Sequence, residues 1–353
     1  MKIGIVGVTG VVGEAILRSL DERAVPVSEL GAFASRDRDE PLFHRGRVVR
    51  VRAATAEALA GGGFDVVFFA SSDDASAELA AHALAGGAVV IDNSATFRLD
   101  PAVPLVVPEV NAHAVRSGHR IFPVANCTAI VLCVGVAPIA RVAGLRNLRV
   151  ATYQAVSGAG RAGLEALAFE EASLARAEAG DGLRPEAPAS PFVAPIARNV
   201  VPQVGSLDDR GDTGEEKKLA AETRKMLELP ALHVAATTVR VPVRFAHSAA
   251  VFLETERDTS VAALAAALAA APGVVFHPGG VVTPREVEGQ DLVHVARLRA
   301  EGDSARHFQL WIVGDQVRKG AATNAVQILQ LLAERGHIAA RASSLLTPGV
   351  DLS

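Results

Sequence analysis

Two thiols, Cys127 and Cys133, are the only cysteines among 353 residues. Cys127 lies in the stretch PVANCTAIVL (123–132), in which small polar residues lead into an apolar run. If residues 129–140 form a helix, Cys127 lies at its N-terminus, where free N–H groups and the helix dipole would lower the thiol pKa. The alternative is a small core residue, because free cysteine is among the most buried residue types.

A glycine-rich turn near the start of the chain indicates a nucleotide site. The segment GVTGVVG (7–13) follows an apparent strand at residues 2–6 and opens an apparent helix. Glycines in such a turn let backbone N–H groups approach a pyrophosphate, and the helix N-terminus favours its charge. A plain strand-to-helix turn is the alternative. A thiolate beside a bound nicotinamide predicts aldehyde chemistry that passes through a hemithioacetal and a thioester.

The segment after the second expected strand bears on the choice of cofactor. That strand ends near Ala34, and residues 35–40 read SRDRDE. Ser35 and Arg36 would accept the 2′-phosphate of NADP, whereas an acidic residue there would hold the ribose hydroxyls of NAD. The segment offers both kinds of residue, so by itself it does not decide between NADP and NAD.

Aldehyde chemistry also needs a base and a clamp for the substrate. His247 and Arg240 lie seven residues apart in the strand-like stretch TVRVPVRFAHS. Such side chains among apolar neighbours are costly unless they find partners. A core histidine with satisfied hydrogen bonds is the alternative for His247.

The order of the elements predicts how these groups are positioned. Through the first 125 or so residues, short apolar runs alternate with helical segments, which predicts a parallel sheet with right-handed helical crossovers. The expected strands and helices are strands at 2–6, 65–70, 88–92 and 105–108 and helices at 13–23 and 75–85.

From about residue 147 the pattern changes. LRVATYQAVSG reads as a strand entering a Gly-rich turn, 237–256 alternates as antiparallel strands do, and 308–316 reads as another strand. Expected helices lie at 163–178, at 214–227, after a cap at Thr259 or Ser260, and at 320–333, with a long surface loop at 179–197.

These patterns predict an α/β chain with an N-terminal Rossmann-like doubly wound domain and an α+β domain with a mostly antiparallel sheet. Residues 1–127 would form the dinucleotide-binding domain, completed by a C-terminal helix at 320–353. Residues 128–319 would form the second domain, whose sheet would serve catalysis and could cover a partner's sheet.

Composition excludes several classes of protein. A net charge of −4 without a basic block argues against nucleic acid, and 4% aromatic residues argue against base-stacking surfaces. Apolar stretches are too short to span a bilayer. Two cysteines cannot build a disulfide framework or a cysteine zinc cluster, and no metal site is expected. The chain opens on a strand rather than a signal peptide, so a reducing cytoplasm is the expected location.

Nine segments occur in one order along the chain: GVTGVVG, DNSATFR, LVVPEVN, ANCTA, ATYQAVSGAGRAG, NVVPQVG, TGEEKKLAAETRK, TVRVPVRFAHS and VGDQVRKGAATNAVQI. Together they resemble aspartate-β-semialdehyde dehydrogenase, with matches from residue 3 to about residue 328. Single segments are weak signals, but nine in order are specific.

The resemblance implies a role for each matched residue. Cys127 would be the nucleophile with Asn126 beside it, His247 the general acid/base, and Gln154 the residue that orients substrate and intermediate. The substrate-binding set would be Arg240 for the carboxylate, Glu215 for the ammonium, and Arg98 and Lys218 for phosphate. The cofactor-binding set would be Gly7, Thr9, Gly10, Val11, Val12, Gly13, Ser35, Arg36, Ser71, Ser157, Gly158 and Gln316. Without the resemblance, Glu215 and Lys218 read as a solvated helix face.

The resemblance also implies a reaction. It is the reversible NADPH-dependent reduction of β-aspartyl phosphate to aspartate β-semialdehyde and phosphate, in lysine, threonine and methionine biosynthesis, with the diaminopimelate branch. The resemblance also implies that the active assembly is a homodimer or a homotetramer. The alternatives are an N-acetyl-γ-glutamyl-phosphate reductase, for which a Gly-Cys-Tyr-Pro-like segment is expected, and a catalytically weak paralogue with a binding or assembly role.

The sequence departs from the family pattern near the expected site. Ala125 stands where the family commonly has proline. Ala246 stands where a glycine often precedes the histidine, and Ala249 stands where a glutamate often follows the serine. Residues 70–73 read Ala-Ser-Ser-Asp in place of Ser-Ala-Gly-Gly. The added charge of Asp73 near the nicotinamide and phosphate is expected to affect cofactor affinity.

Overall fold

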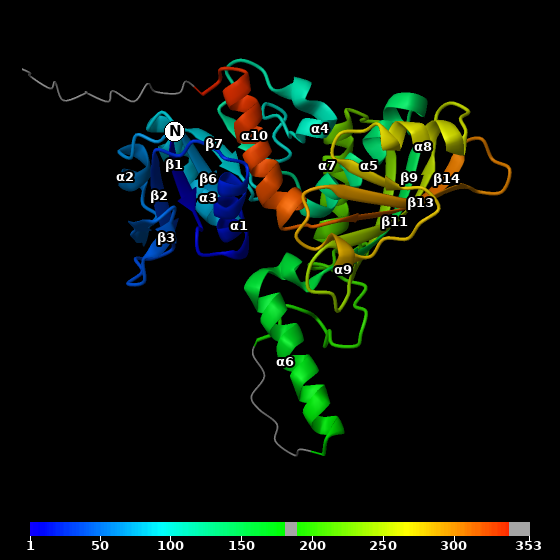
Figure 1. Ribbon diagram of the computed structural model, residues 1–353, viewed down its shortest axis with the longest axis horizontal. Helices are drawn as coiled ribbons and strands as arrows, with labels where there is room; N and C mark the ends of the chain where they lie inside the picture. Colours follow the sequence, from blue (N-terminus) through cyan, green and yellow to red (C-terminus); the bar gives the residue numbers. More distant parts are fainter. Residues whose placement is uncertain (181–188, 339–353) are drawn as a thin grey trace, which may run out of the picture.

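The computed structural model describes residues 1–180 and 189–338, in which two sheets lie side by side (Figure 1). Every neighbouring strand pair in the first sheet is parallel. Its order is β5 (Val51–Ala53), β2 (Glu29–Ala34), β1 (Lys2–Val6), β6 (Val66–Phe69), β7 (Val89–Asp92) and β8 (Ile121–Pro123). Strands β6 and β7 are buried throughout, as parallel strands with helices on both faces must be.

Helices cover this sheet on both faces. On one face α1 (Val11–Glu22) and α10 (Thr323–Glu334) share a core with β1, and on the other α2 (Ala56–Ala60) and α3 (Asp73–Ala85) share a second core with β6. The predicted doubly wound arrangement is therefore confirmed. Helix α10 follows a π-helical turn (Arg318–Ala322), and residues 339–353 of the predicted terminal helix lie outside the described residues.

The strand predicted at residues 105–108 is wrong. Residues 105–107 are buried but unpaired with any strand, and Pro108 begins the short helix α4 (Pro108–Asn111). Side-chain amides replace a neighbouring strand: Asn111 bonds the backbone of Leu105 and Val107, and Asn324 donates to the carbonyl of Val106. Buried backbone groups must be paired, and these are satisfied without a ladder. Strand β8 takes the edge position.

The second sheet is mixed. Its order is β10 (His233–Arg240), β9 (Asn147–Gln154), β11 (His247–Glu254), β14 (His307–Gly314), β13 (Val293–Ala300) and β12 (Val274–His277). Three of its neighbouring pairs are antiparallel, and two are parallel. The mostly antiparallel sheet is confirmed, but 237–256 does not form two adjacent strands, because β9 lies between β10 and β11.

Three helices pack on one face of this sheet: α5 (Cys127–Ala143), α7 (Gly214–Leu227) and α8 (Val261–Ala269). The predicted bounds of α7 are confirmed, and a capping box between Thr213 and Glu216 fixes its start. Ser260 caps α8. The opposite face carries a shallow hollow near Tyr153 and Trp311, which are the single tyrosine and the single tryptophan of the sequence.

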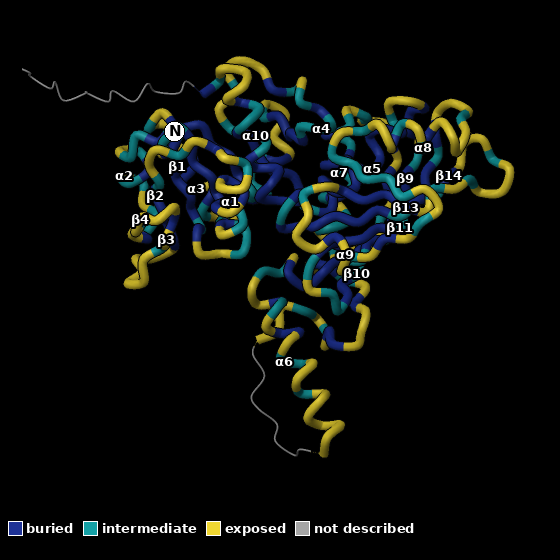
Figure 2. Tube along the Cα trace, in the orientation of Figure 1, coloured by how far each residue is buried: buried dark blue, intermediate teal, exposed yellow. Residues whose placement is uncertain are grey.

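One helix projects away from both sheets. Helix α6 (Gly160–Glu178) is largely exposed beyond its first two turns, and the following described residues pack against its base (Figure 2). Residues 181–188 of the predicted loop lie outside the described residues, and 189–197 form no helix or strand. The remaining elements are the hairpin β3 (Leu42–His44) and β4 (Arg47–Val49), α9 (Pro284–Val287), and 3-10 turns at Ala112–Ala114 and Val156–Ala159.

Candidate active site

The ends of both sheets converge on one hollow. In the parallel sheet the chain leaves β1, β6, β7 and β8 at the same carboxyl edge, which is where ligands bind in open α/β sheets. In the second sheet β9 and β10 end in register at Gln154 and Arg240, and His247 starts β11 beside them. The topology therefore brings polar ends from distant parts of the chain to one place.

The hollow has a volume of about 300 Å³ and takes its lining from both domains. Nine predicted site residues line it: Val12, Ser71, Arg98, Asn126, Cys127, Ser157, Gly158, Lys218 and Gln316. Gln154, Glu215, Arg240 and His247 join this group through hydrogen bonds or close contacts, described below.

Cys127 is the first residue of α5, as predicted. The Asn126 side chain caps the helix by accepting from the backbone N–H groups of Thr128 (3.0 Å) and Ala129 (3.1 Å). Cys127 keeps partial exposure, whereas Cys133 is buried. Of the two thiols, Cys127 is therefore the accessible one.

His247 faces the thiol. Its Nε2 lies 3.7 Å from Cys127 Sγ, and its Nδ1 accepts the backbone N–H of Ala155 at 3.1 Å. A ring nitrogen that accepts a hydrogen bond carries no proton, so the neutral ring carries its proton on Nε2. Burial, followed by the charge of Arg240, lowers the His247 pKa well below its usual value. His247 is therefore neutral near pH 7 and presents an N–H donor to the thiol.

The prediction that the helix N-terminus lowers the Cys127 pKa is wrong. Burial raises the pKa of Cys127 to about 11, and the Glu215 carboxylate adds to the rise. The Thr128 hydroxyl and the guanidinium groups of Arg98 and Arg240 act in the opposite direction with smaller effect. Desolvation of a thiolate outweighs the helix terminus here, so the thiol is protonated in the free protein.

Glu215 links helix α5, which begins at Cys127, to the second sheet. Its Oε1 accepts from Asn126 Nδ2 (2.9 Å), Gln154 Nε2 (3.2 Å) and the Thr128 hydroxyl (3.4 Å). Oε1 is thus fully used, and the carboxylate supplies negative charge near Cys127.

Arg240 is buried at the end of β10. It donates to the Ala155 carbonyl at 2.6 Å, and its guanidinium lies 5.7 Å from the centre of the Phe192 ring. A Cβ on Gly158 would lie 2.7 Å from Arg240 Nη1 and 3.2 Å from His247 Nε2. A side chain at Gly158 would therefore collide with both groups.

Arg98 and Lys218 approach the hollow from different elements. Arg98 is 8% exposed and donates to the carbonyls of Val124 (2.9 Å) and Asn93 (2.7 Å). Lys218 comes from α7, one turn after Glu215. Two cations at the same hollow make a site for an anion of the size of phosphate.

The glycine turn forms the first crossover. Gly7 has φ +85°, and a Cβ there would lie 2.2 Å from the Ala70 carbonyl oxygen. A Cβ on Gly13 would lie 2.2 Å from the Gly7 oxygen, so close packing of strand and helix requires both glycines. Gly10 is the N-cap of α1, Val11 begins the helix, and no side-chain hydrogen bond caps it.

The residues predicted to bind the 2′-phosphate of NADP do not line the hollow that contains Cys127. Thr9 and Arg36 line a second, open hollow of about 660 Å³, together with acidic residues of 37–40 and Arg161 of α6. Ser35 is exposed directly after β2. This hollow contains both arginines and carboxylates, so it does not discriminate between NADP and NAD.

Three buried polar atoms have no hydrogen-bond partner within the described part of the chain and belong to residues that line the site. They are Ser71 Oγ, Asn93 Oδ1 and Gln316 Oε1. Gln316 Nε2 donates to the Ser157 hydroxyl, which leaves the amide oxygen free to accept. Buried polar atoms are almost always paired, so these three fit a polar ligand such as a nicotinamide carboxamide.

The altered loop at 70–73 has a structural role. Ser72 caps α3, and the Asp73 carboxylate accepts the backbone N–H of Ala95 at 2.7 Å. Asp73 thus ties the start of α3 to the loop that carries Arg98, and its charge also sits favourably in the first turn of a helix.

Glu222 of α7 is a site residue that the sequence prediction missed. It is 1% exposed, and its carboxylate accepts from the Asn126 backbone N–H and from Arg98. A signal was present, because Glu222 lies between Leu219 and Met226, which are both fully buried on the inner face of the helix. Asn93, another missed residue, directly follows β7 at the carboxyl edge.

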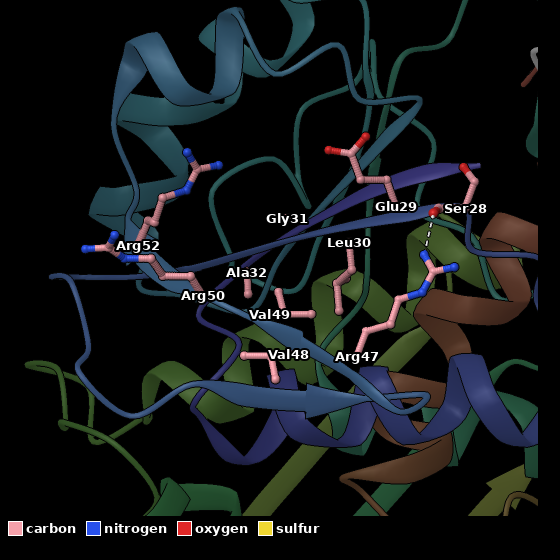
Figure 3. Close-up of a pocket in the computed structure, with 10 residues that line it drawn as sticks. All are labelled: Ser28, Glu29, Leu30, Gly31, Ala32, Arg47, Val48, Val49, Arg50 and Arg52. Carbon is pink, nitrogen blue, oxygen red and sulfur yellow. Dashed lines mark hydrogen bonds between the residues drawn. The ribbon is translucent and has the colours of Figure 1, made fainter.

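A separate hollow of about 470 Å³ lies at the far edge of the first sheet, between β2 and β4 (Figure 3). Arg50 and Arg52 point away from Arg47, which reaches toward the Ser28 carbonyl. None of the predicted site residues lines it. Its cations do not converge, so it is not a second candidate for the reaction.

Within residues 1–180 and 189–338, no helix is both long and apolar enough to cross a membrane. The same residues contain no cluster of three or more histidine, cysteine or acidic side chains suited to a metal ion.

The fold and the site together define a semialdehyde dehydrogenase. Residues 2–118 match the semialdehyde dehydrogenase NAD binding domain, and residues 136–319 match the semialdehyde dehydrogenase dimerisation domain. An aspartate-semialdehyde dehydrogenase from Aquifex aeolicus is 38% identical over 345 residues, covering 96% of this chain and 99% of that protein. One from Streptomyces akiyoshiensis is 42% identical over 340 residues, covering 94% and 98%.

The crystal structure of aspartate semialdehyde dehydrogenase II from Vibrio cholerae is similar throughout. It has a TM-score of 0.88 and 37% identity, over 94% of this chain and 98% of that one. The same enzyme complexed with ASA gives a TM-score of 0.88 at 36% identity. The chain belongs to the aspartate-semialdehyde dehydrogenase family.

Proposed function

We propose that the protein interconverts β-aspartyl phosphate and aspartate β-semialdehyde, with a nicotinamide cofactor and a thioester on Cys127. The observation that carries this proposal is the position of Cys127 Sγ, 3.7 Å from His247 Nε2 in a hollow that joins the two domains. All relatives reported above are named for this activity, which favours it over an N-acetyl-γ-glutamyl-phosphate reductase. Cys127, Gln154 and His247 lie together at one site, which disfavours an inactive paralogue.

The reductive direction follows from the site. The Cys127 thiol gives up its proton to the departing phosphate oxygen, Sγ bonds the acyl carbon, and the carbon–oxygen bond to phosphate breaks, leaving a thioester. Arg98 and Lys218 receive the phosphate. When bound, a nicotinamide cofactor would supply the hydride that reduces the thioester carbon. His247 donates its Nε2 proton to the carbonyl oxygen and takes it back as the Sγ–carbon bond breaks and the aldehyde forms.

The substrate requires opposite charges at its two other ends. Arg240 would bind the carboxylate with its planar fork, and Glu215 would hold the ammonium. Glu215 already accepts hydrogen bonds from Asn126 and Gln154, so an ammonium there would also fix Gln154 beside the reacting carbon.

NADP is the proposed cofactor, and NAD is the second candidate. The glycine turn with Thr9, Val12 and Gly13 would hold the pyrophosphate, and Ser71, Ser157, Gly158 and Gln316 would hold the nicotinamide end. The unpaired oxygen atoms of Ser71 and Gln316 support this assignment. Ser35 and Arg36 would bind the 2′-phosphate of NADP, and the carboxylates of 37–40 would bind the ribose hydroxyls of NAD, so the choice of NADP rests on the family resemblance.

A homodimer or a homotetramer is the proposed assembly. The face of the second sheet opposite its helices carries Phe252, which is 41% exposed, and the paired rings of Tyr153 and Trp311. The match to a dimerisation domain supports the assembly. A biosynthetic role in the cytoplasm accompanies the proposal, because a catalytic free thiol needs a reducing compartment.

The test is direct. Purified protein is mixed with aspartate semialdehyde, inorganic phosphate and either NADP or NAD, and the absorbance of the reduced cofactor is followed. Turnover that requires phosphate and is faster with NADP is expected. No turnover with either cofactor, from protein that melts cooperatively, would contradict the proposed function.

A further inference from the structure

Glu222 joins two functional groups that belong to different parts of the chain. Its Oε2 accepts the backbone N–H of Asn126 at 2.5 Å, and its Oε1 accepts from Arg98 Nη1 at 3.4 Å. Asn126 is the cap of the nucleophile helix, and Arg98 is held otherwise by two backbone carbonyls of the first domain. One buried carboxylate thus contacts both the start of α5 and Arg98, the candidate phosphate-binding residue.

Helix α7 brings three charged residues to this place at helical spacing. Glu215, Lys218 and Glu222 stand at positions i, i+3 and i+7, which share one face of a helix. Glu215 contacts the side chain of Asn126, and Glu222 contacts its backbone. Two carboxylates of one helix therefore bracket the residue before Cys127.

The charges near the phosphate position also bear on Glu222. Arg98 pairs with Glu222, whereas Lys218 lines the hollow. A carboxylate next to Arg98 opposes any anion that binds the same guanidinium, so it weakens phosphate binding. A site that must both accept and release phosphate gains from such a limit, since phosphate held too tightly would slow turnover.

We propose that Glu222 is a positioning residue whose two carboxylate oxygens have different roles. Oε2 fixes the backbone before Cys127, and Oε1 offsets the charge of Arg98 so that phosphate binds reversibly. The identity of the anion as phosphate rests on the proposed function. The electrostatic coupling between Glu222 and Arg98 is independent of the proposed function.

Two variants separate the two oxygens. Glu222→Gln keeps an acceptor for the Asn126 N–H but removes the charge, so we expect the phosphate KM to fall at least fivefold, with the aldehyde KM changed less than twofold. Glu222→Asp keeps the charge but is one methylene shorter, so the acceptor retreats from Asn126. We expect its kcat to fall about tenfold, because misplaced reacting groups lose rate steeply.

A thermal measurement tests the charge without using activity. Phosphate stabilises the state that binds it, so adding inorganic phosphate to the full chain with NADP should raise the melting temperature of Glu222→Gln more than that of the wild type. Glu216→Gln is the matched control, because Glu216 is on the same helix and, among the residues that the structure describes, accepts only from Thr213 and Thr238. It should lower stability while leaving the phosphate KM and the phosphate-induced shift unchanged.

The outcomes decide between the possibilities. A phosphate KM and thermal shift equal to wild type in Glu222→Gln overturn the charge role, and an unchanged kcat in Glu222→Asp overturns the backbone role. If Glu222→Gln does not fold, Glu222→Ala, which also removes the charge, takes its place. A phosphate-induced shift equal to that of the wild type in Glu222→Ala then overturns the coupling between Glu222 and Arg98. Absence of turnover in the wild type refutes the proposed function instead, and the thermal comparison still decides on Glu222.

Discussion

Replacing Gly320 by alanine should displace Cys127, the proposed nucleophile, without unfolding the protein. Gly320 lies in the π-helical turn before α10, and a Cβ there would lie 2.9 Å from Cys127 Cβ and 3.2 Å from Cys127 Cα and O. Carbon atoms in contact are normally about 3.5–4.0 Å apart, so Cys127 or the turn must move by roughly 0.6–1 Å. Gly320 does not have a positive φ, so alanine is otherwise allowed.

The magnitudes favour a loss of rate over a loss of stability. Overpacking costs about 1–3 kcal/mol, and alanine regains about 1 kcal/mol over glycine in a helical turn, so the net loss of stability should be about 2 kcal/mol or less. A displacement near 1 Å at a reacting group costs on the order of 10²-fold in rate. We therefore expect kcat of Gly320→Ala to fall about 10- to 100-fold while the protein stays folded.

The assay measures initial rates of cofactor reduction and the melting temperature on the same sample. Gly135→Ala is the control, because Gly135 lies on the same helix as Cys127, and its Cβ would lie 2.6 Å from Ile312 Cδ1 in the core. That variant should lose stability but keep its kcat per folded molecule. A wild-type kcat in Gly320→Ala, or an equal loss in both variants, would refute the reasoning.

Three further predictions concern the reacting groups. Cys127→Ser should abolish turnover while Cys133→Ala, in a buried thiol, should not; comparable losses would mean that the nucleophile is misassigned. His247→Asn should lower kcat by about 10²-fold or more with an unchanged cofactor Kd, since general acid–base catalysis contributes about 10²–10⁴-fold; a main effect on cofactor binding would contradict that role. Because the Cys127 pKa is raised to about 11 and only the thiolate reacts, alkylation of the free protein by iodoacetamide should accelerate about tenfold per pH unit from pH 7 to 9. A plateau in that range would show a thiolate already formed.

Local patterns in the sequence predicted most of the fold. The apolar run at β6 and the start of α8 at its Ser260 cap could be read because periodicity and capping depend on neighbouring residues. The segment at 105–108 was misread because apolar composition cannot distinguish a strand from a buried segment paired by asparagine side chains. The position of β9 between β10 and β11 was also hidden, since strand order depends on contacts far apart in the chain.

The site divides in the same way. Residue types and order placed Cys127, His247 and Arg240 on the right elements, and the structure brings them together. Glu222 could have been recognised as a charged residue in a buried helical position, but its partner Arg98 lies 124 residues away. The raised pKa of Cys127 could not be read at all, because it depends on burial and on Glu215 from another element.

That raised pKa changes how the nucleophile must work. A thiol that is protonated beside a neutral His247, with Glu215 adding negative charge, is not activated by the protein alone. Of the two causes, burial stays when substrate enters, whereas the charge of Glu215 is offset by any ammonium group bound to it. Substrate that carries an ammonium should therefore lower the Cys127 pKa, and an aldehyde or acyl phosphate without one should react slowly even if it fits the hollow. If Glu215 holds the ammonium as proposed, the same carboxylate would also control when the thiol becomes reactive, which would link specificity to rate at one side chain.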